Sequence, residues 1–386
     1  MDFDLSDEQR MLQDSVQRLL AEQCSFEQRH ALITHPDGAG RALWQQFAEL
    51  GLLGLPFAEE DGGFGGGAVD TFLVMQALGR ALAPVPYLAT VVLCGGLLRA
   101  AASASQRAEL VPRIAAGELT LALAHSEAQA RYDLADVRTT ARRAGDGWVL
   151  EGEKRFVLAG DTADRFIVSA RVAPASAEAD GIALFLVDAA QAGLARRGYL
   201  SQDRNRCADL RLNAVTLGAD ALLGEPGHAL PAIEAAVDAS IAALCAEAVG
   251  AMDYAHDLTV DYLKVRKQFG VAIGSFQALQ HRAVDMLVAA EQGRSMALYA
   301  TMMCTEQDPR ERARAISAAK VQINQSARFV GQEAVQLHGG IGMTEECQVG
   351  HYLRRLSMIE MQFGDTAHHV RKLARAGGLI AQTSSP

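Results

Sequence analysis

The segment Arg266-Lys-Gln-Phe-Gly270 and the nearby Gln277 combine side chains that suit a phosphate-containing ligand. The planar guanidinium of Arg266 can meet a phosphate through two parallel hydrogen bonds. The amides of Gln268 and Gln277 can add hydrogen bonds, and the ring of Phe269 can pack on a flat apolar group. The alternative is that Arg266 only caps the end of a helix.

A second pattern, Gln336-Leu-His-Gly-Gly340, ends in two adjacent glycines. Because Gly339 and Gly340 lack a Cβ, their backbone N–H groups can approach a phosphate closely. The alternative is a glycine pair that only ends a helix. Taken alone, each of the two patterns leaves ligand binding and a plain helix end about equally favoured.

The cysteines and histidines do not indicate a metal site. The six cysteines are scattered along the chain and are expected to be reduced, mostly core thiols. The histidines that draw attention have no partner at metal-binding spacing; they are His125, His338, His368 and His369.

Composition excludes some classes of partner. The 386 residues carry a formal net charge of −10, and such an acidic surface opposes nucleic-acid binding. The N-terminal residues lack the basic and apolar regions of a signal peptide. No apolar run reaches the roughly 18 residues that a membrane helix needs. The expectation is a cytoplasmic protein without a membrane partner.

The periodicity of apolar residues divides the chain into three parts. Residues 1–118 have a helical period, and Ser6 with Gln9 forms a capping-box pattern. Residues 119–225 contain short strand-like runs punctuated by turns, with no parallel sheet expected. Residues 226–386 return to the helical period, in four long helices over 233–264, 276–304, 313–337 and 351–375. We predict a mainly α protein with an N-terminal helical domain, a central β-barrel-like domain and a C-terminal four-helix bundle.

This order and these motifs resemble the acyl-CoA dehydrogenase family over essentially the whole chain. The family's Arg-x-x-Phe-Gly…Gln pattern stands at Arg266 to Gln277, and its Gln-x-x-Gly-Gly-x-Gly pattern stands at Gln336 to Gly342. The segment from Leu50 to Gly63 is also similar to the family's N-terminal region. Because both motifs occur, and in the same order along the chain as in the family, ligand binding is favoured over the interpretation that they only end helices.

The resemblance implies FAD as the cofactor. In the family, the residues that match Arg266, Gln268, Phe269, Gln277, Gln336, Gly339 and Gly340 serve FAD that is held mainly by the neighbouring subunit. The match therefore implies at least a dimer. The resemblance also implies an acyl-CoA substrate and an electron-transfer flavoprotein as electron acceptor.

The chain departs from the family at the catalytic base. Family members remove a proton from the carbon alpha to the thioester with a glutamate, usually from a Glu-Gly-Thr triplet. The aligned residues here are Gly364, Asp365 and Thr366. A minority of members place the glutamate 26 residues before the motif arginine, but here that position is Ser240, followed by Ile241 in place of the usual arginine.

Three interpretations of this departure stay open. Asp365 can act as a displaced base, although a shift of about 1 Å can cost roughly 10²-fold in rate. Glu247 lies on the same helical face as Ser240 but roughly 10 Å further along, so it suits only a substrate seated differently, or it is a polar residue with a buried partner. The third and favoured interpretation is that this chain abstracts no proton. The Gly364 N–H can still bind a thioester oxygen, and Gly364→Glu is expected to recover turnover if Asp365 is accommodated and the flavin is seated.

The middle region has lost part of the family's flavin contacts. The signature Thr-Glu-Pro-Gly-Ala-Gly-Ser-Asp is represented by Ser126 to Asp133, which keeps its first and last polar residues but no glycine. The family's Trp-Ile-Thr contact becomes Phe156-Val-Leu158, where Phe156 can still flank a ring but Leu158 has no hydroxyl. Contacts to a subunit's own FAD therefore look eroded, except for Thr366.

Two further positions match family residues. Asp238 matches a residue near CoA, although one exposed aspartate on a helix is weak evidence. His368 stands where some members have a flavin-contacting glutamine, and a surface-helix role is equally favoured.

The resulting functional prediction is the small, non-basic subunit of a heteromeric FAD-dependent acyl-CoA dehydrogenase. A second dehydrogenase-like subunit would supply the glutamate and the main flavin platform. The rivals are a self-sufficient homo-oligomeric dehydrogenase that uses Asp365 or Glu247, and a structural family member that binds no flavin.

Overall fold

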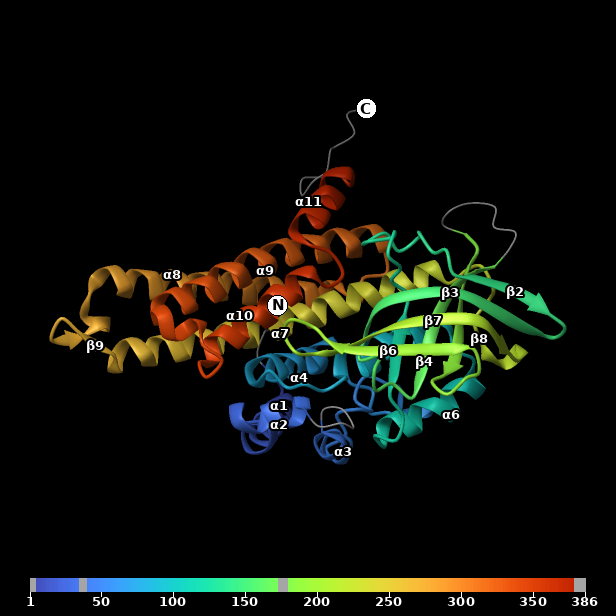
Figure 1. Ribbon diagram of the computed structural model, residues 1–386, viewed down its shortest axis with the longest axis horizontal. Helices are drawn as coiled ribbons and strands as arrows, with labels where there is room; N and C mark the ends of the chain where they lie inside the picture. Colours follow the sequence, from blue (N-terminus) through green and yellow to red (C-terminus); the bar gives the residue numbers. More distant parts are fainter. Residues whose placement is uncertain (1–4, 35–39, 173–179, 378–386) are drawn as a thin grey trace. The chain divides into compact units, whose positions relative to one another are not determined.

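The structure, a computed structural model, describes residues 5–34, 40–172 and 180–377. Helices come first along the chain, strands follow, and a second set of helices closes the sequence (Figure 1). This order confirms the predicted fold class, which is mainly helical with a central β region.

The N-terminal helices begin and end where local signals indicate. Ser6 Oγ accepts a hydrogen bond from Gln9 N–H, and Gln9 Oε1 accepts one from Ser6 N–H, both at 3.1 Å, which confirms the capping box. The helices are α1 (Asp7–Gln23), α2 (Phe26–Thr34), α3 (Arg41–Glu49), α4 (Ala68–Ala81), a π-helix (Leu88–Cys94), α5 (Gly95–Ala101) and α6 (Ala104–Ala115).

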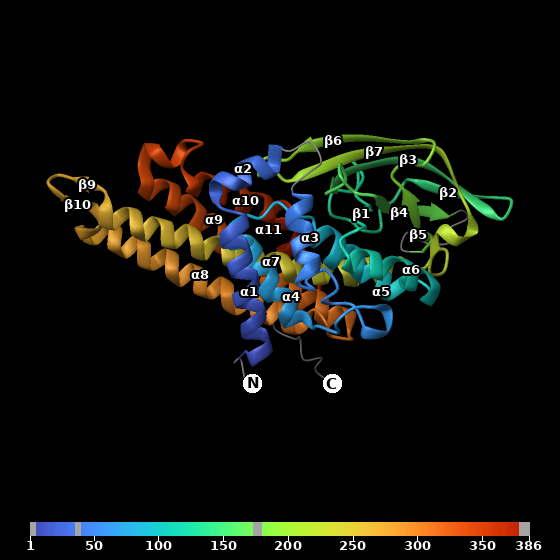
Figure 2. The same cartoon turned by 90° about the horizontal axis from the view of Figure 1, so that it is seen from below.

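One sheet occupies the middle of the chain. Its strands are β1 (Leu121–Ala124), β2 (Thr140–Ala144), β3 (Gly147–Leu158), β4 (Arg165–Val172), β5 (Ile182–Asp188), β6 (Leu194–Leu200), β7 (Arg206–Leu217) and β8 (Leu222–Leu223). They follow the order β6-β7-β3-β2-β4-β5-β8, and β1 also pairs with β4. Figure 2 shows β6, β7 and β3 side by side.

The sheet is mixed, which corrects the expectation of a middle region without parallel strands. β1 and the first two residues of β2 pair in parallel with β4, whereas the other neighbours are antiparallel. Parallel pairing needs a long connection. The residues between β1 and β2 provide one, and they carry the family signature. The buried face of the sheet includes Trp148 and Phe185, whose rings meet edge to face at 5.2 Å.

The C-terminal region contains five helices rather than the predicted four. They are α7 (Leu230–Val265), α8 (Gln277–Met303), α9 (Pro309–His338), α10 (Gln348–Met361) and α11 (Thr366–Arg375), with a short hairpin of β9 (Lys267–Gln268) and β10 (Val271–Ala272). The helix predicted over 351–375 is broken because Phe363 has φ +57° and Gly364 has φ +123°. Both values lie outside helical backbone geometry.

The described chain forms two compact units. Within the described residues, one comprises 5–29, 68–83 and 241–377, and the other comprises 30–34, 40–67, 84–172 and 180–240. The boundaries at residues 118 and 225 remain predictions. One helix, α7, is long and apolar enough to cross a membrane by composition, but 89% of its most apolar window is buried in the protein.

Candidate functional site

The β9–β10 hairpin presents an aromatic ring at its tip. Gln268 pairs with Val271, which leaves Phe269 and Gly270 as a two-residue turn with φ of +54° and +81°. A bulky residue rarely adopts positive φ, and holding it there costs on the order of 1–3 kcal/mol. Phe269 is nevertheless 91% exposed, and its ring meets only the edge of Phe276 at 6.2 Å. Burial within this chain does not account for that conformation.

Three exposed polar residues, Arg266, Gln268 and Gln277, lie close to Phe269 in the sequence. Arg266 follows the last turn of α7, and its backbone oxygen accepts from Ile273 N–H at 2.8 Å, which closes the hairpin base. Gln277 is the first residue of α8. Within residues 5–34, 40–172 and 180–377, the side chains of Arg266, Gln268 and Gln277 form no hydrogen bond or ion pair.

The glycine pair lies at the C-terminal end of α9. Gly339 has φ +65° and ψ −146°, which only glycine adopts readily, whereas Gly340 does not have positive φ. A Cβ built on either residue meets no atom of this chain within 4 Å. The chain's own packing therefore does not require Gly340, and its backbone is open to another molecule.

The hairpin and the glycine pair lie at the same end of the helices (Figure 1). The Tyr262 ring in the last turns of α7 stacks on the His338 ring at the end of α9, with centroids 4.3 Å apart. Arg282 of α8 forms an ion pair with Glu333 of α9 at 2.6 Å. Burial lowers the pKa of His338, which favours the neutral imidazole for stacking. The structure thus brings the two sequence-predicted motifs together.

The α10–α11 turn contains the predicted base position. Asp365 caps α11, because its Oδ1 accepts a hydrogen bond from His368 N–H at 2.7 Å. Thr366 Oγ1 donates to Glu360 Oε1 at 3.2 Å. A Cβ on Gly364 would lie 2.5 Å from His369 Nε2, so there is no room for a side chain. This contact opposes the expectation that Gly364→Glu recovers turnover.

His369 holds this turn from inside. Its Nε2 faces the Phe363 carbonyl at 3.2 Å, and since a carbonyl only accepts, Nε2 carries the proton. Nδ1 then accepts from the Ser317 hydroxyl at 3.2 Å. Burial, with the charge of Lys320, lowers the pKa of His369 to about 3, so the ring is neutral near pH 7.

Glu247 has the buried partner that the sequence left as an alternative. Its two carboxylate oxygens accept from Arg355 Nε at 2.6 Å and Nη2 at 2.7 Å, and Glu247 is 8% exposed. This fork–fork geometry uses both oxygens. Lys320 is also buried nearby and donates to the Ile359 carbonyl, and burial lowers its pKa to about 8.

Ser240 and Asp238 lie on α7. Ser240 is fully buried, and its hydroxyl donates to the Ala236 carbonyl one turn earlier at 2.7 Å, so that hydroxyl is engaged in its own helix. Ile241 is buried beside it. Asp238 is 4% exposed, which corrects the expectation of an exposed aspartate.

The structure brings Ser126 and Phe156 together in the β region. A bulge in β3 places Arg155 and Phe156 opposite Asp209 alone, and Phe156 has φ +51°. Asp209 Oδ1 accepts from Phe156 N–H at 3.2 Å, and Ser126 O accepts from Arg155 N–H at 2.8 Å. Ser126 therefore accepts the hydrogen bond of Arg155, and Phe156 directly follows the donor residue.

Two buried lysines and one buried glutamate were not predicted from the sequence. Lys154 and Glu127 form a buried ion pair in the β region, and Lys320 lies buried in the helical unit. The only sequence signal for their burial was a lysine flanked by apolar residues in a strand or helix. This signal is weak, because lysines are far more often exposed to solvent. Across the described residues, no group of three metal-ligating side chains is assembled.

Comparisons with known proteins agree over the whole chain. The sequence models of the acyl-CoA dehydrogenase N-terminal, middle and C-terminal domains match residues 6–118, 122–215 and 230–378. A probable acyl-CoA dehydrogenase of Bacillus subtilis, YngJ, is 29% identical over 388 residues, which cover 98% of this chain and 100% of the relative.

Several solved structures are similar at 25% identity or more, and two of them come from protein pairs. A chain of a structure described as a Tcur3481-Tcur3483 steroid ACAD variant is 28% identical with a TM-score of 0.86, covering 96% of this chain and 97% of the other. A chain of the ChsE4-ChsE5 complex from Mycobacterium tuberculosis is 25% identical with a TM-score of 0.87, covering 100% of both chains.

The three-part fold and these matches define the class as flavoprotein oxidoreductases of fatty acid oxidation. This chain belongs to the acyl-CoA dehydrogenase family.

Proposed function

We propose that this chain is the non-basic subunit of a heteromeric FAD-dependent acyl-CoA dehydrogenase. The observation that carries the proposal is that each candidate base position is either without an acceptor side chain or already engaged in a contact within this chain. Gly364 has no side chain and no room for one, Ser240 is bonded within its helix, and Glu247 is engaged on both oxygens by Arg355. Asp365 accepts the His368 N–H through Oδ1 as the cap of α11, which ties its carboxylate to the start of that helix.

A second alignment of the base triplet leads to the same conclusion. If Gly364 matches the glycine of the family's Glu-Gly-Thr triplet, the base position falls on Phe363 and the threonine position on Asp365. The φ of +123° at Gly364 favours this match, because that conformation suits glycine. Phenylalanine cannot accept a proton, so neither alignment supplies a base.

The residues at the hairpin end of the helices fit a dinucleotide cofactor. Arg266 can meet a pyrophosphate, Gln268 and Gln277 can donate amide hydrogen bonds, and the exposed Phe269 ring can pack on an adenosine. The space around the built Cβ atoms of Gly339 and Gly340 supports close approach by a phosphate. When bound, FAD supplies the acceptor for a hydride from the beta carbon of an acyl-CoA.

In this proposal the partner subunit provides the carboxylate that removes the alpha proton. This chain's own residues bind and orient: the hairpin and glycine pair would hold FAD that the partner subunit mainly binds. Two similar solved structures are named for pairs of proteins, which supports a heteromer. The N-terminal segments of this sequence also resemble the small subunit of pimeloyl-CoA dehydrogenase. We further propose an electron-transfer flavoprotein as acceptor and a cytoplasmic location.

Purification with and without the partner tests the proposal. The tagged chain is isolated from its native host, and copurifying dehydrogenase-like subunits are identified by mass spectrometry. We expect a colourless chain alone and a yellow complex. Yellow protein from the chain alone, with flavin bleached by butyryl-CoA or palmitoyl-CoA, would instead establish the self-sufficient homo-oligomer. Protein that stays colourless in every preparation would favour a structural role.

The rival in which this chain carries its own base has a separate test. Asp365→Asn and Glu247→Gln are made in the native assembly, and anaerobic flavin reduction is followed by stopped flow. We expect less than about a tenfold change for either variant that folds, because neither carboxylate removes the alpha proton. A loss of several orders of magnitude, with acyl-CoA still bound, would overturn the proposal.

A further inference from the structure

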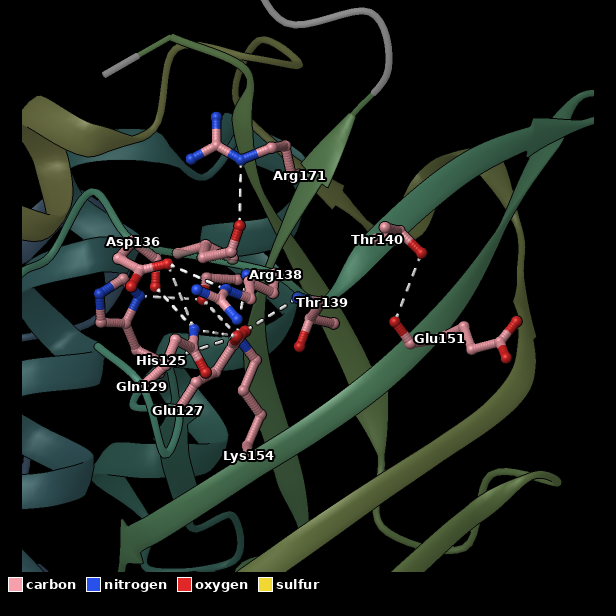
Figure 3. Close-up of polar contacts among 12 residues, drawn as sticks. His125, Glu127, Gln129, Asp136, Arg138, Thr139, Thr140, Glu151, Lys154 and Arg171 are labelled. Carbon is pink, nitrogen blue, oxygen red and sulfur yellow. Dashed lines mark hydrogen bonds and ion pairs between the residues drawn. The ribbon is translucent and has the colours of Figure 1, made fainter. Parts of the chain in front are cut away.

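Lys154 is a fully buried lysine whose ammonium has every donor satisfied. Its Nζ donates to Glu127 Oε1 at 2.7 Å, to Ser169 Oγ at 3.0 Å and to the His125 carbonyl at 3.2 Å (Figure 3). An ammonium has three donors, so these three acceptors complete it. Isolated buried ammonium groups are strongly disfavoured, which makes this arrangement specific.

Glu127 is satisfied on its side of the pair. Oε1 also accepts from Thr139 N–H at 3.0 Å, and Oε2 accepts from Arg138 N–H at 2.8 Å and Gln129 Nε2 at 2.9 Å. Burial alone would raise the pKa of Glu127, but Lys154 and these hydrogen bonds lower it to about 2. Burial lowers the pKa of Lys154 to about 8, so both groups are charged near pH 7.

This network joins segments that are distant in the sequence. Glu127 lies near the start of the segment that connects β1 to β2 and accepts from the N–H groups of Arg138 and Thr139 at its end, while Lys154 ties this segment to β3. The residue after Lys154 donates its N–H to the carbonyl of Ser126, the residue before Glu127. The ion pair therefore adjoins, residue by residue along both chain segments, the hydrogen bond from Arg155 N–H to the Ser126 carbonyl.

A second cation, the guanidinium of Arg171, holds residues 135–137 of the same segment. Arg171 of β4 donates from Nε to the Val137 carbonyl at 3.0 Å and from Nη2 to the Ala135 carbonyl at 2.7 Å. The segment lacks the glycines of the family signature, but the Lys154–Glu127 pair and Arg171 both hold it in place.

The energetics separate positioning from stability. A buried ion pair is frequently neutral when both partners are replaced by neutral groups of similar volume, because desolvation offsets attraction. Such a replacement does, however, remove a constraint on geometry. In the native chain, the carboxylate of Glu127 accepts from two backbone N–H groups and from the ammonium of Lys154, which fixes their relative positions. We propose that the Lys154–Glu127 pair is a positioning device that holds the segment 126–139 against the β3 bulge, so that Ser126 and Phe156 present one flavin-facing surface. The flavin role of that surface rests on the proposed function.

Hydrogen exchange of the isolated chain tests the positioning without any flavin. The variants are Lys154→Met and the double variant Lys154→Met/Glu127→Gln, which leaves no unpaired buried charge if the single variant does not fold. Arg211→Met, an exposed arginine on β7, is the matched control for loss of one positive charge. Peptides from 126–139 are compared with peptides from β5.

We expect exchange in 126–139 to accelerate about tenfold or more in the double variant, while β5 changes less than about twofold. Unchanged exchange in 126–139 would overturn the proposal. Equal acceleration in both regions would also overturn it, because the pair would then serve only global stability.

A second measurement addresses the flavin surface in the assembled complex. The absorbance band of bound FAD and its dissociation constant are measured for the same variants. We expect a shifted band and weaker binding in the double variant but not in Arg211→Met. If the wild-type complex holds no FAD, the proposed function fails while the exchange result still decides the positioning. If FAD is held and its band is unchanged in a variant with a loosened segment, the flavin-facing part is wrong.

Discussion

At the scale of single residues, the carboxylates of this chain are distinguished by their partners. Arg355 of α10 donates two hydrogen bonds to the carboxylate of Glu247 of α7, and both side chains are buried. Asp365 satisfies a helix N–H instead. A base must direct a lone pair at the substrate, whereas the bonds observed here hold Glu247 against Arg355 and tie Asp365 to the start of α11.

Breaking the Glu247–Arg355 pair is expected to destabilise the protein strongly. Glu247→Gln or Arg355→Met should lower the free energy of unfolding by about 3–5 kcal/mol, because each leaves one buried group without its partner. The double variant Glu247→Leu/Arg355→Met should recover most of that loss. Urea denaturation followed by circular dichroism measures all three, and additive single effects would contradict a coupled pair.

Replacing Gly364 is also expected to destabilise the protein. Gly364→Ala should cost about 2–4 kcal/mol of stability, since it combines positive φ with a contact too close to His369. Gly377→Ala is the matched control, because Gly377 has φ +88° but no neighbour within 4 Å of a built Cβ. Thermal unfolding of the two variants compares them. Gly364→Glu should neither fold well nor restore flavin reduction, and measurable turnover in that variant would contradict the geometry.

At the scale of elements, the β9–β10 hairpin connects α7 and α8 and holds Phe269 in a conformation that costs free energy. Such strain persists where a surrounding structure or a ligand requires it. The hairpin is two residue pairs long, so its stability comes from its attachment to α7 and α8 and not from its own ladder.

Two hairpin variants should separate strain from ligand binding. Arg266→Ala should weaken FAD binding in the complex by about 1.5–3 kcal/mol, because a charge-assisted hydrogen bond is lost. Phe269→Gly should leave stability unchanged or raise it by up to about 1 kcal/mol while weakening FAD binding. Lys264→Ala, at an exposed lysine of α7, is the control. Flavin-to-protein ratios after gel filtration and fluorescence titrations measure the effects, and wild-type FAD affinity in Arg266→Ala would show that this arginine is not a ligand.

At the scale of the whole molecule, neutral buried imidazoles make the fold sensitive to acid. Burial lowers the pKa of His125 and of His369 from 6.5 to about 3. The unfolded chain therefore binds more protons between about pH 6.5 and pH 3, and stability falls as the pH falls through that window. Glu127, with its pKa lowered from 4.5 to about 2, loses its contribution between those values.

The acid prediction is a drop of a few kcal/mol per buried histidine between pH 6.5 and pH 4. Urea midpoints measured across this range should fall steeply for the wild type and less steeply for His369→Gln. His281→Gln, at an exposed position on α8, should retain the wild-type slope. A wild-type midpoint that is flat across this range would contradict the neutral buried state of both imidazoles.

The sequence by itself determined the class of fold and the location of the two family motifs. Apolar periods of 3.6 and 2 follow directly from which face of a helix or strand is buried, so they are visible without a structure. The Ser6–Gln9 cap and the segment from Arg266 to Gln277 are likewise local, because their residues are close in the chain. The break of the last helix at Phe363–Gly364 was missed, since a single glycine does not reveal the sign of its φ.

Only the tertiary structure decided what the candidate site can do. Glu247 and Arg355 are 108 residues apart, and no local pattern connects them. The contact between Gly364 and the His369 ring depends on the turn between two helices, and the buried Lys154–Glu127 pair depends on packing one connection against a distant strand. Whether a carboxylate acts as a base or as a structural partner depends on which donors surround it in space, and that arrangement arises only when the chain has folded.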